Sequence, residues 1–133
     1  MPVIFERKDA TLTVRIDARS RYGLDLLSRI KRRSISEIVV SELKEILDKE
    51  LPASRIEGAE VPLLDAAWDV FGPDRVVKLA LYAPELLTED EQKIWRVISE
   101  NQSYVPRRGK PDFAAIRRDW MRIQKKVREY GSL

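Results

Sequence analysis

The chain has 133 residues, 44% of them hydrophobic and 35% charged, and it contains neither cysteine nor histidine. This composition suits a folded core with a charged surface, and it excludes disulfide scaffolds, thiolate zinc sites and catalysis by Ser-His-Asp or Cys-His groups. We expect no enzymatic activity, no metal and no cofactor. The lack of a signal-peptide pattern, and of any apolar run near twenty residues, predicts a cytoplasmic protein without membrane association.

The net charge of +3 is unevenly distributed along the chain. Residues 1–50 carry a net charge of +2, residues 51–100 carry −5 and residues 101–133 carry +6. The acidic middle segment is therefore not expected to contact phosphate, and it suits a basic protein partner instead.

The first predicted elements are a strand and a helix. Thr11–Ile16 alternates polar and apolar residues, which is typical of a short strand. A helix is expected from about Ala18, and three apolar residues spaced by three lie along one of its faces: Leu24, Leu27 and Ile30. Residues 1–10 form no pattern and are assigned to an N-terminal arm.

A second helix is predicted from a capping box. In Ser34-Ile35-Ser36-Glu37 the serine side chain can accept from the Glu37 amide while the Glu37 side chain reaches back. The helix is expected to run to about Glu50, before Pro52. Its apolar stripe has helical period and comprises Ile35, Ile38, Val39, Leu43, Ile46 and Leu47.

The remainder, residues 61–133, predicts a small all-helical domain after a linker at residues 52–60. Pro62 opens an apolar helix that Gly72-Pro73 is expected to stop, and another helix follows to about Ala83. Thr88-Glu89-Asp90-Glu91 predicts a second capping box. A final helix is expected from an Asp112 cap, with a heptad-spaced seam of Phe113, Ile116, Trp120, Ile123, Val127 and Tyr130. This seam either packs on the preceding helices, which we favour, or pairs with another protein.

The three tryptophans are Trp68, Trp95 and Trp120. We expect them to anchor the core, with base stacking as the alternative.

The order of one strand, two helices and a capped Arg33-Ser34-Ile35-Ser36-Glu37 turn resembles the ribbon-helix-helix, or MetJ/Arc/CopG-like, family over about residues 11–51. The chain departs from many relatives at Lys31-Arg32-Arg33, where they have glycine. The resemblance implies a mainly α fold with an intertwined dimer, and binding of double-stranded DNA at a short repeat. It also implies transcriptional repression.

A single six-residue strand needs a partner, and the available candidate is the same strand in a second chain. In an antiparallel ribbon the apolar residues would face the helices and the polar residues would form the opposite face. That face fits the major groove, so we expect base contacts from Thr11, Thr13 and Arg15. The start of the second helix suits phosphate, with expected contacts from Arg32, Arg33, Ser34 and Ser36.

The basic loop before the last helix is either an ordinary solvated surface or an additional DNA contact through Arg107, Arg108 and Lys110. The C-terminal domain is expected to mediate higher oligomerisation or to bind a protein partner. Alternative functions are an autoregulating antitoxin, a plasmid relaxosome or partition accessory factor, and a purely protein-binding helical adaptor. The plainest structural alternative is that strand and helices are the edge of an α+β core, with Arg15 simply solvated.

Overall fold

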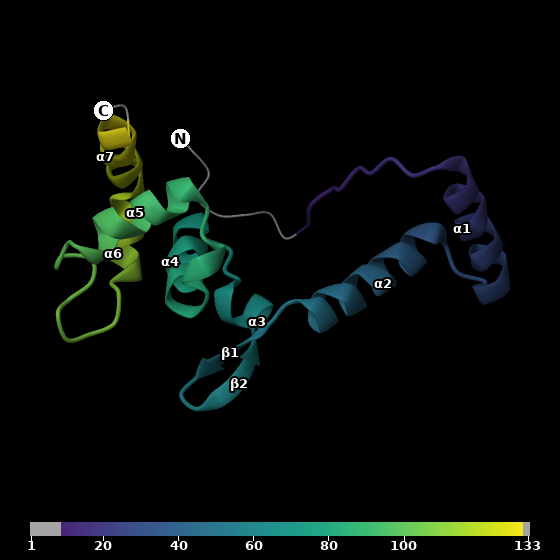
Figure 1. Ribbon diagram of the computed structural model, residues 1–133, viewed down its shortest axis with the longest axis horizontal. Coiled ribbons are helices and arrows are strands. Elements are labelled where there is room, and N and C mark those ends of the chain that lie inside the picture. Colours follow the sequence, from purple (N-terminus) through teal and green to yellow (C-terminus); the bar gives the residue numbers. More distant parts are fainter. Residues whose placement is uncertain (1–8, 132–133) are drawn as a thin grey trace. The chain divides into compact units, whose positions relative to one another are not determined.

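The computed structural model describes residues 9–131, which are mainly helical as predicted, with one two-stranded antiparallel sheet (Figure 1). Residues 1–8 of the predicted N-terminal arm lie outside the described residues. The elements in chain order are α1 (Ala18–Lys31), α2 (Ile35–Glu50), β1 (Ala53–Ile56), β2 (Ala59–Pro62), α3 (Leu63–Ala67), α4 (Gly72–Tyr82), the 3-10 helix η1 (Pro84–Leu86), α5 (Glu89–Ser99), α6 (Phe113–Arg118) and α7 (Trp120–Gly131).

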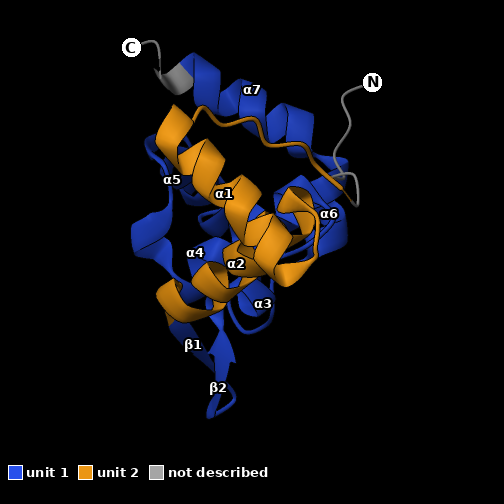
Figure 2. Cartoon of the chain, turned by 90° about the vertical axis from the view of Figure 1, so that its right-hand side faces the viewer, with its two compact units in different colours: residues 1–8, 53–133 blue, residues 9–52 orange. Residues whose placement is uncertain are grey.

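The described chain divides into two compact units, residues 9–52 and residues 53–131, coloured orange and blue in Figure 2. We call them the N-terminal unit and the C-terminal unit. The N-terminal unit contains α1 and α2, joined by a short turn, and its only buried large apolar residue is Ile38. A unit of this size with one buried side chain has little core of its own.

The predicted strand Thr11–Ile16 has no regular secondary structure in the single chain, so the ribbon-helix-helix order is not confirmed. Figure 1 shows this segment as an open trace leading into α1. The physical reason is that a strand is held by hydrogen bonds to a neighbouring strand. One copy of the chain offers this segment no such neighbour among its described residues.

The C-terminal unit has a core built from α4, α5, α6 and α7. Its buried cluster is Val77, Ile98, Tyr104, Ala115, Ile116, Trp120 and Ile123. The seam of the last helix therefore packs on the preceding helices, as favoured, with Phe113 half-buried and Val127 also buried. The Tyr130 side chain lies outside the described residues.

The predicted linker at residues 52–60 is wrong from Ala53 onward, because the chain forms the hairpin β1–β2 there (Figure 1). Ser54 pairs with Val61, and Arg55 lies opposite Glu60. The two turn residues both have positive φ, 51° at Glu57 and 81° at Gly58, which is the backbone of a two-residue turn that matches strand twist. Glycine adopts this φ without strain, whereas a residue with a side chain, such as Glu57, adopts it at an energetic cost.

The expectation that Gly72-Pro73 stops a helix is also wrong, because this pair begins α4. Proline suits the first turn of a helix, where its missing N–H would have no helical partner. The preceding helix α3 ends earlier, at Ala67, and the segment before α4 is held by a hydrogen bond from the Phe71 N–H to the Asp69 carboxylate at 2.9 Å.

The final helix begins at the predicted cap, where the Asp112 carboxylate accepts from the Ala115 N–H at 3.1 Å. It is not one helix, however, because Asp119 leaves helical geometry between α6 and α7. Backbone hydrogen bonds continue across this position, from Asp119 to Ala115 and from Ile123 to Asp119. The Asp119 carboxylate is meanwhile held by the Tyr104 hydroxyl at 2.8 Å and by Arg118.

Candidate nucleic-acid interface

The three residues predicted to contact bases lie on the segment before α1. Thr11, Thr13 and Arg15 are all exposed. The apolar residues between them are exposed as well: Leu12 by 74%, Val14 by 66% and Ile16 by 49%. The side chains expected to face the helices therefore have no apolar cover in a single chain.

The turn between α1 and α2 has the left-handed geometry that glycine usually supplies. Arg32 has φ 53° and its N–H donates to the Ser28 carbonyl. The Arg33 N–H also donates to that carbonyl, at 3.3 Å, and the Ser28 hydroxyl donates to the Arg33 carbonyl at 2.5 Å. A non-glycine residue in this region costs about 1–2 kcal/mol. The Ser28 bonds on both sides help to hold Arg32 in place.

The start of α2 has half of the predicted capping box. The Ser34 hydroxyl accepts from the Glu37 N–H at 3.1 Å, whereas the Glu37 carboxylate accepts from Arg33 Nε at 3.4 Å. With Glu37 capped, the N–H groups of Ile35 and Ser36 are left at the positive end of the helix dipole. Arg32, Arg33, Ser34 and Ser36 are all exposed there. This turn presents donors and positive charge to solvent, which is the chemistry of a phosphate contact.

A single chain does not bring the base-contact and phosphate-contact residues together. The first set precedes α1 and the second follows it, and a helix of 14 residues is about 20 Å long. Both sets belong to the N-terminal unit.

The basic loop belongs to the C-terminal unit. Arg107, Arg108 and Lys110 are exposed. The loop is closed at its base by a hydrogen bond from the Asp112 N–H to the Tyr104 carbonyl at 2.7 Å.

Burial raises the pKa of Tyr104, and its hydrogen bond to Asp119 raises it further. Donation from Arg118 and then from Tyr104 lowers the pKa of Asp119 to about 2.

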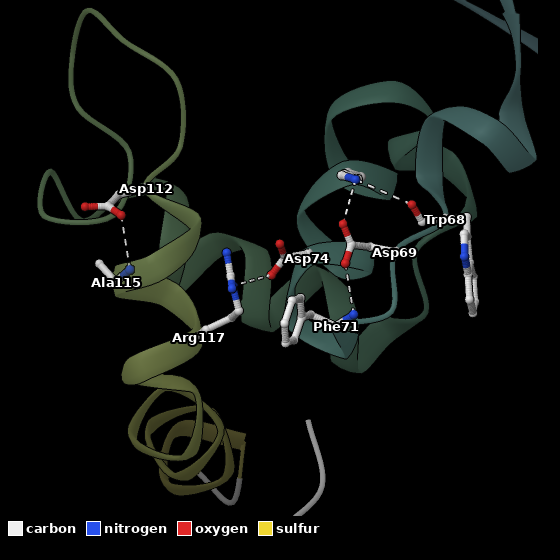
Figure 3. A network of polar contacts seen from close by, with 8 residues as sticks. Trp68, Asp69, Phe71, Asp74, Asp112, Ala115 and Arg117 are labelled. Carbon is white, nitrogen blue, oxygen red and sulfur yellow. Dashed lines mark hydrogen bonds and ion pairs between the residues drawn. The ribbon is translucent and has the colours of Figure 1, made fainter. Parts of the chain in front are cut away.

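Two ion pairs that the sequence did not predict join elements of the C-terminal unit (Figure 3). Arg117 of α6 places Nε 3.1 Å from Oδ1 of the buried Asp74 of α4, without the alignment of a hydrogen bond, and its guanidinium lies over the Phe71 ring. Lys78 donates to Asp69 at 2.8 Å. Burial raises the pKa of Asp74, and Arg117 opposes that effect. Burial also acts to raise the pKa of Asp69, but the bonds from Lys78 and the Phe71 N–H outweigh it and leave this pKa lowered.

The tryptophans divide between core and surface. Trp120 is buried and Trp95 packs against the core, in agreement with the prediction, but Trp68 is 47% exposed, so its assignment to the core is wrong. Trp68 lies beyond the end of α3, and the Arg75 guanidinium sits 5.2 Å from its ring centre.

The residues that the structure describes contain no group of three or more acidic side chains placed to hold a metal ion. None of the helices in that part of the chain is both long enough and apolar enough to cross a membrane. The sequence matches no protein-family model, and comparisons with curated proteins and with solved structures find no match either.

Proposed function

We propose that this chain is a sequence-specific DNA-binding regulator, acting in the cytoplasm as a homodimer through residues 11–51. The ribbon would read bases with Thr11, Thr13 and Arg15, and the α1–α2 turn would hold phosphate. The regulatory outcome we favour is repression of transcription. Two observations support the proposal: the local sequence pattern of residues 11–51, and the large apolar side chains that are exposed in a single chain.

The observation that carries the proposal is the apolar surface of the N-terminal unit. Eleven large apolar side chains in residues 9–52 are exposed by 38–77%. They are Leu12, Val14, Ile16, Tyr22, Leu26, Ile30, Val39, Val40, Leu43, Ile46 and Leu47. A solvent-facing surface of this kind is rare in a monomer and marks an interface. A second copy would cover it and would also supply the missing strand partner, so one association satisfies both requirements.

The exposure of the predicted cationic contacts also supports the proposal. Arg15 projects from the segment expected to form the ribbon, and Arg32 and Arg33 stand beside the free amides of α2. In a symmetric dimer each of these groups occurs twice, as a repeated DNA site requires. The division of roles follows: the ribbon discriminates bases and the turn fixes register.

The test is fluorescence anisotropy of the full chain on duplexes tiled from the DNA upstream of its gene, over a salt series. Wild type is expected to prefer one tile. Arg15→Ala is expected to lose about tenfold or more of that preference, since a bidentate arginine–guanine contact is worth about 1–3 kcal/mol. Arg55→Ala, which removes one exposed charge from β1, is the matched control and should keep the preference.

Equal affinity for all tiles, unchanged by Arg15→Ala, would overturn the proposal and assign binding to the basic loop. In that case Arg107→Ala with Arg108→Ala would flatten the salt dependence by about 0.9 in log–log slope for each phosphate that the loop no longer neutralises.

A second candidate function is an antitoxin that also regulates its own operon. It is favoured by the net charge of −5 over residues 51–100, together with the exposed Leu64, Trp68 and Val70 of the C-terminal unit. An exposed tryptophan stacked by arginine is typical of an interface anchor. Co-expression with the product of an adjacent gene for a small basic protein tests it: a stoichiometric complex that Trp68→Ala dissolves supports this function, and no complex contradicts it.

A further inference from the structure

The C-terminal unit contains a cleft of about 690 Å³ between α5 and α7, beside the turn that follows α5. Small-molecule sites commonly have volumes of roughly 300–1,000 Å³. Three cations line this cleft, Lys93 and Arg96 from α5 and Lys126 from α7. The proposed DNA contacts use none of them.

The positive charges of these three side chains are largely unneutralised by ion pairs within the described residues. Neither Arg96 nor Lys126 has an ion-pair partner within the described part of the chain. Lys93 lies 3.6 Å from Glu89, but Glu89 is 84% exposed, and such surface pairs contribute little. By contrast, Arg117 and Arg118 of the same unit are paired with aspartates. Positive charge is thus available inside a concave site.

The amide groups of the cleft add hydrogen-bond donors. Asn101 lines the cleft, and its side-chain oxygen already accepts from the Ser103 N–H at 2.9 Å. The side-chain NH2 group of Asn101 can therefore donate hydrogen bonds to a ligand in the cleft. Gln102 lies beside it, and Glu100 contributes the one carboxylate against three cations. A ligand that matches this lining is rich in acceptors and carries two negative charges.

The cleft also has an apolar part. Val97 of α5 is half-buried and Val127 of α7 is buried, and both belong to its lining. Val97 also packs on the core, so only its remaining exposed surface is open to a ligand. An inorganic anion would leave that surface in water, whereas an apolar group attached to the anion would cover it.

We propose that this cleft binds a small phosphate monoester, with the dianionic phosphate between Arg96 and Lys126 and the apolar body over the two valines. A DNA phosphodiester has related chemistry but carries one negative charge, and a duplex is too wide to enter a cleft of this volume. The site is independent of the proposed DNA contacts, since it uses other residues.

The test is isothermal titration of the full chain with phenyl phosphate at pH 7.5 and without DNA, where the monoester is largely dianionic because its second pKa is about 6. Saturable binding is expected. Arg96→Gln with Lys126→Gln should weaken it at least about tenfold, because charge-assisted hydrogen bonds are lost. Arg107→Gln with Arg108→Gln removes the same charge from the exposed loop and should leave binding unchanged. Dimethyl phosphate, a monoanionic diester, and phenol, which lacks the phosphate, should each bind at least about tenfold more weakly.

Several results would overturn the site: no saturable binding, equal loss in both double variants, or dimethyl phosphate binding as tightly as phenyl phosphate. Methyl NMR of the wild type supplies a check that does not depend on the variants, because the Val97 and Val127 signals should shift with phenyl phosphate. Unshifted valine signals would also contradict the proposal. All of these measurements omit DNA, so a failure here leaves the DNA-binding proposal standing, and the reverse also holds.

Discussion

Replacing Val14 by alanine should weaken the homodimer by about thirtyfold. In the single chain this side chain is 66% exposed, so a monomer would hardly respond, with a change within about 0.5 kcal/mol. In a ribbon dimer it is expected to be covered. The substitution removes two carbons at about 0.8 kcal/mol each, and about two-thirds of that burial would be gained only on association, which makes about 1 kcal/mol per copy and about 2 kcal/mol per dimer.

Sedimentation velocity over a concentration series measures this effect as a change in the dimer dissociation constant. Thr13→Ala is the matched control, because Thr13 is the neighbouring residue on the opposite face of the expected ribbon and should leave the constant within about threefold. The reasoning is refuted if Thr13→Ala and Val14→Ala weaken the dimer equally, or if neither changes it. A wild-type chain that stays monomeric at every concentration also refutes it.

Three further substitutions test the local account. Arg32→Gly should raise the free energy of unfolding by up to about 1 kcal/mol, because glycine relieves the φ of 53° while adding chain entropy, and thermal denaturation measures the gain. Thr88→Ala should cost about 1 kcal/mol, since it removes the cap that accepts from Glu91 at the start of α5, and urea unfolding measures the loss. Asp119→Asn should remove a stability contribution that appears only above acid pH. The pKa of Asp119 is lowered to about 2 when folded, against an ordinary value of about 3.9. The contribution is therefore complete above about pH 4 and is lost as the pH falls from about 4 to 2. Urea unfolding at pH 5, 3 and 2 measures it.

Each of these substitutions has a variant that isolates its cause. Lys31 is the last residue of α1, so Lys31→Gly leaves the φ of Arg32 unrelieved and should destabilise, the opposite sign to Arg32→Gly. Thr88→Ser keeps the hydroxyl and should retain most of the stability. Tyr104→Phe should raise the pKa of Asp119 above about 2, because it removes the hydrogen bond from the Tyr104 hydroxyl. Carboxyl NMR titration follows that pKa, and an unchanged value would contradict the assignment.

Features set by a few neighbouring residues can be predicted from the sequence. Thr88 and Asp112 begin helices as expected, because a cap needs only a side-chain oxygen and an amide three residues later. The hairpin escapes prediction because Glu57-Gly58 lacks the Asn-Gly or Asp-Gly signal and the strands are four residues each. Gly72-Pro73 is ambiguous in sequence, because proline breaks a helix interior but also suits its first turn.

Features that join distant residues cannot be predicted in this way. The Asp74–Arg117 pair connects α4 to α6, and no local spacing indicates which aspartate a given arginine meets. The cleft between α5 and α7 depends likewise on how two helices pack. The exposure of Trp68 follows from where α3 ends, which the apolar run does not show.

The same distinction between local and distant features applies to the candidate site. Its residues can be named from the sequence because alternation and capping are local, and all of them are exposed. In the proposed dimer their arrangement would depend on a second copy of the chain, and a strand that pairs across copies would leave no contact within one.

The central claim is that Thr11–Ile16 pairs with the same segment of a second copy. Isotope-filtered NMR on an equimolar mixture of labelled and unlabelled full-length chains tests it most directly. The account predicts intermolecular NOEs between residues 11–16 of the two copies, with the close cross-strand approach of an antiparallel ribbon, about 4.5–5.5 Å between Cα atoms. A dimer whose intermolecular NOEs exclude this segment, or a sample without any such NOEs, would contradict it.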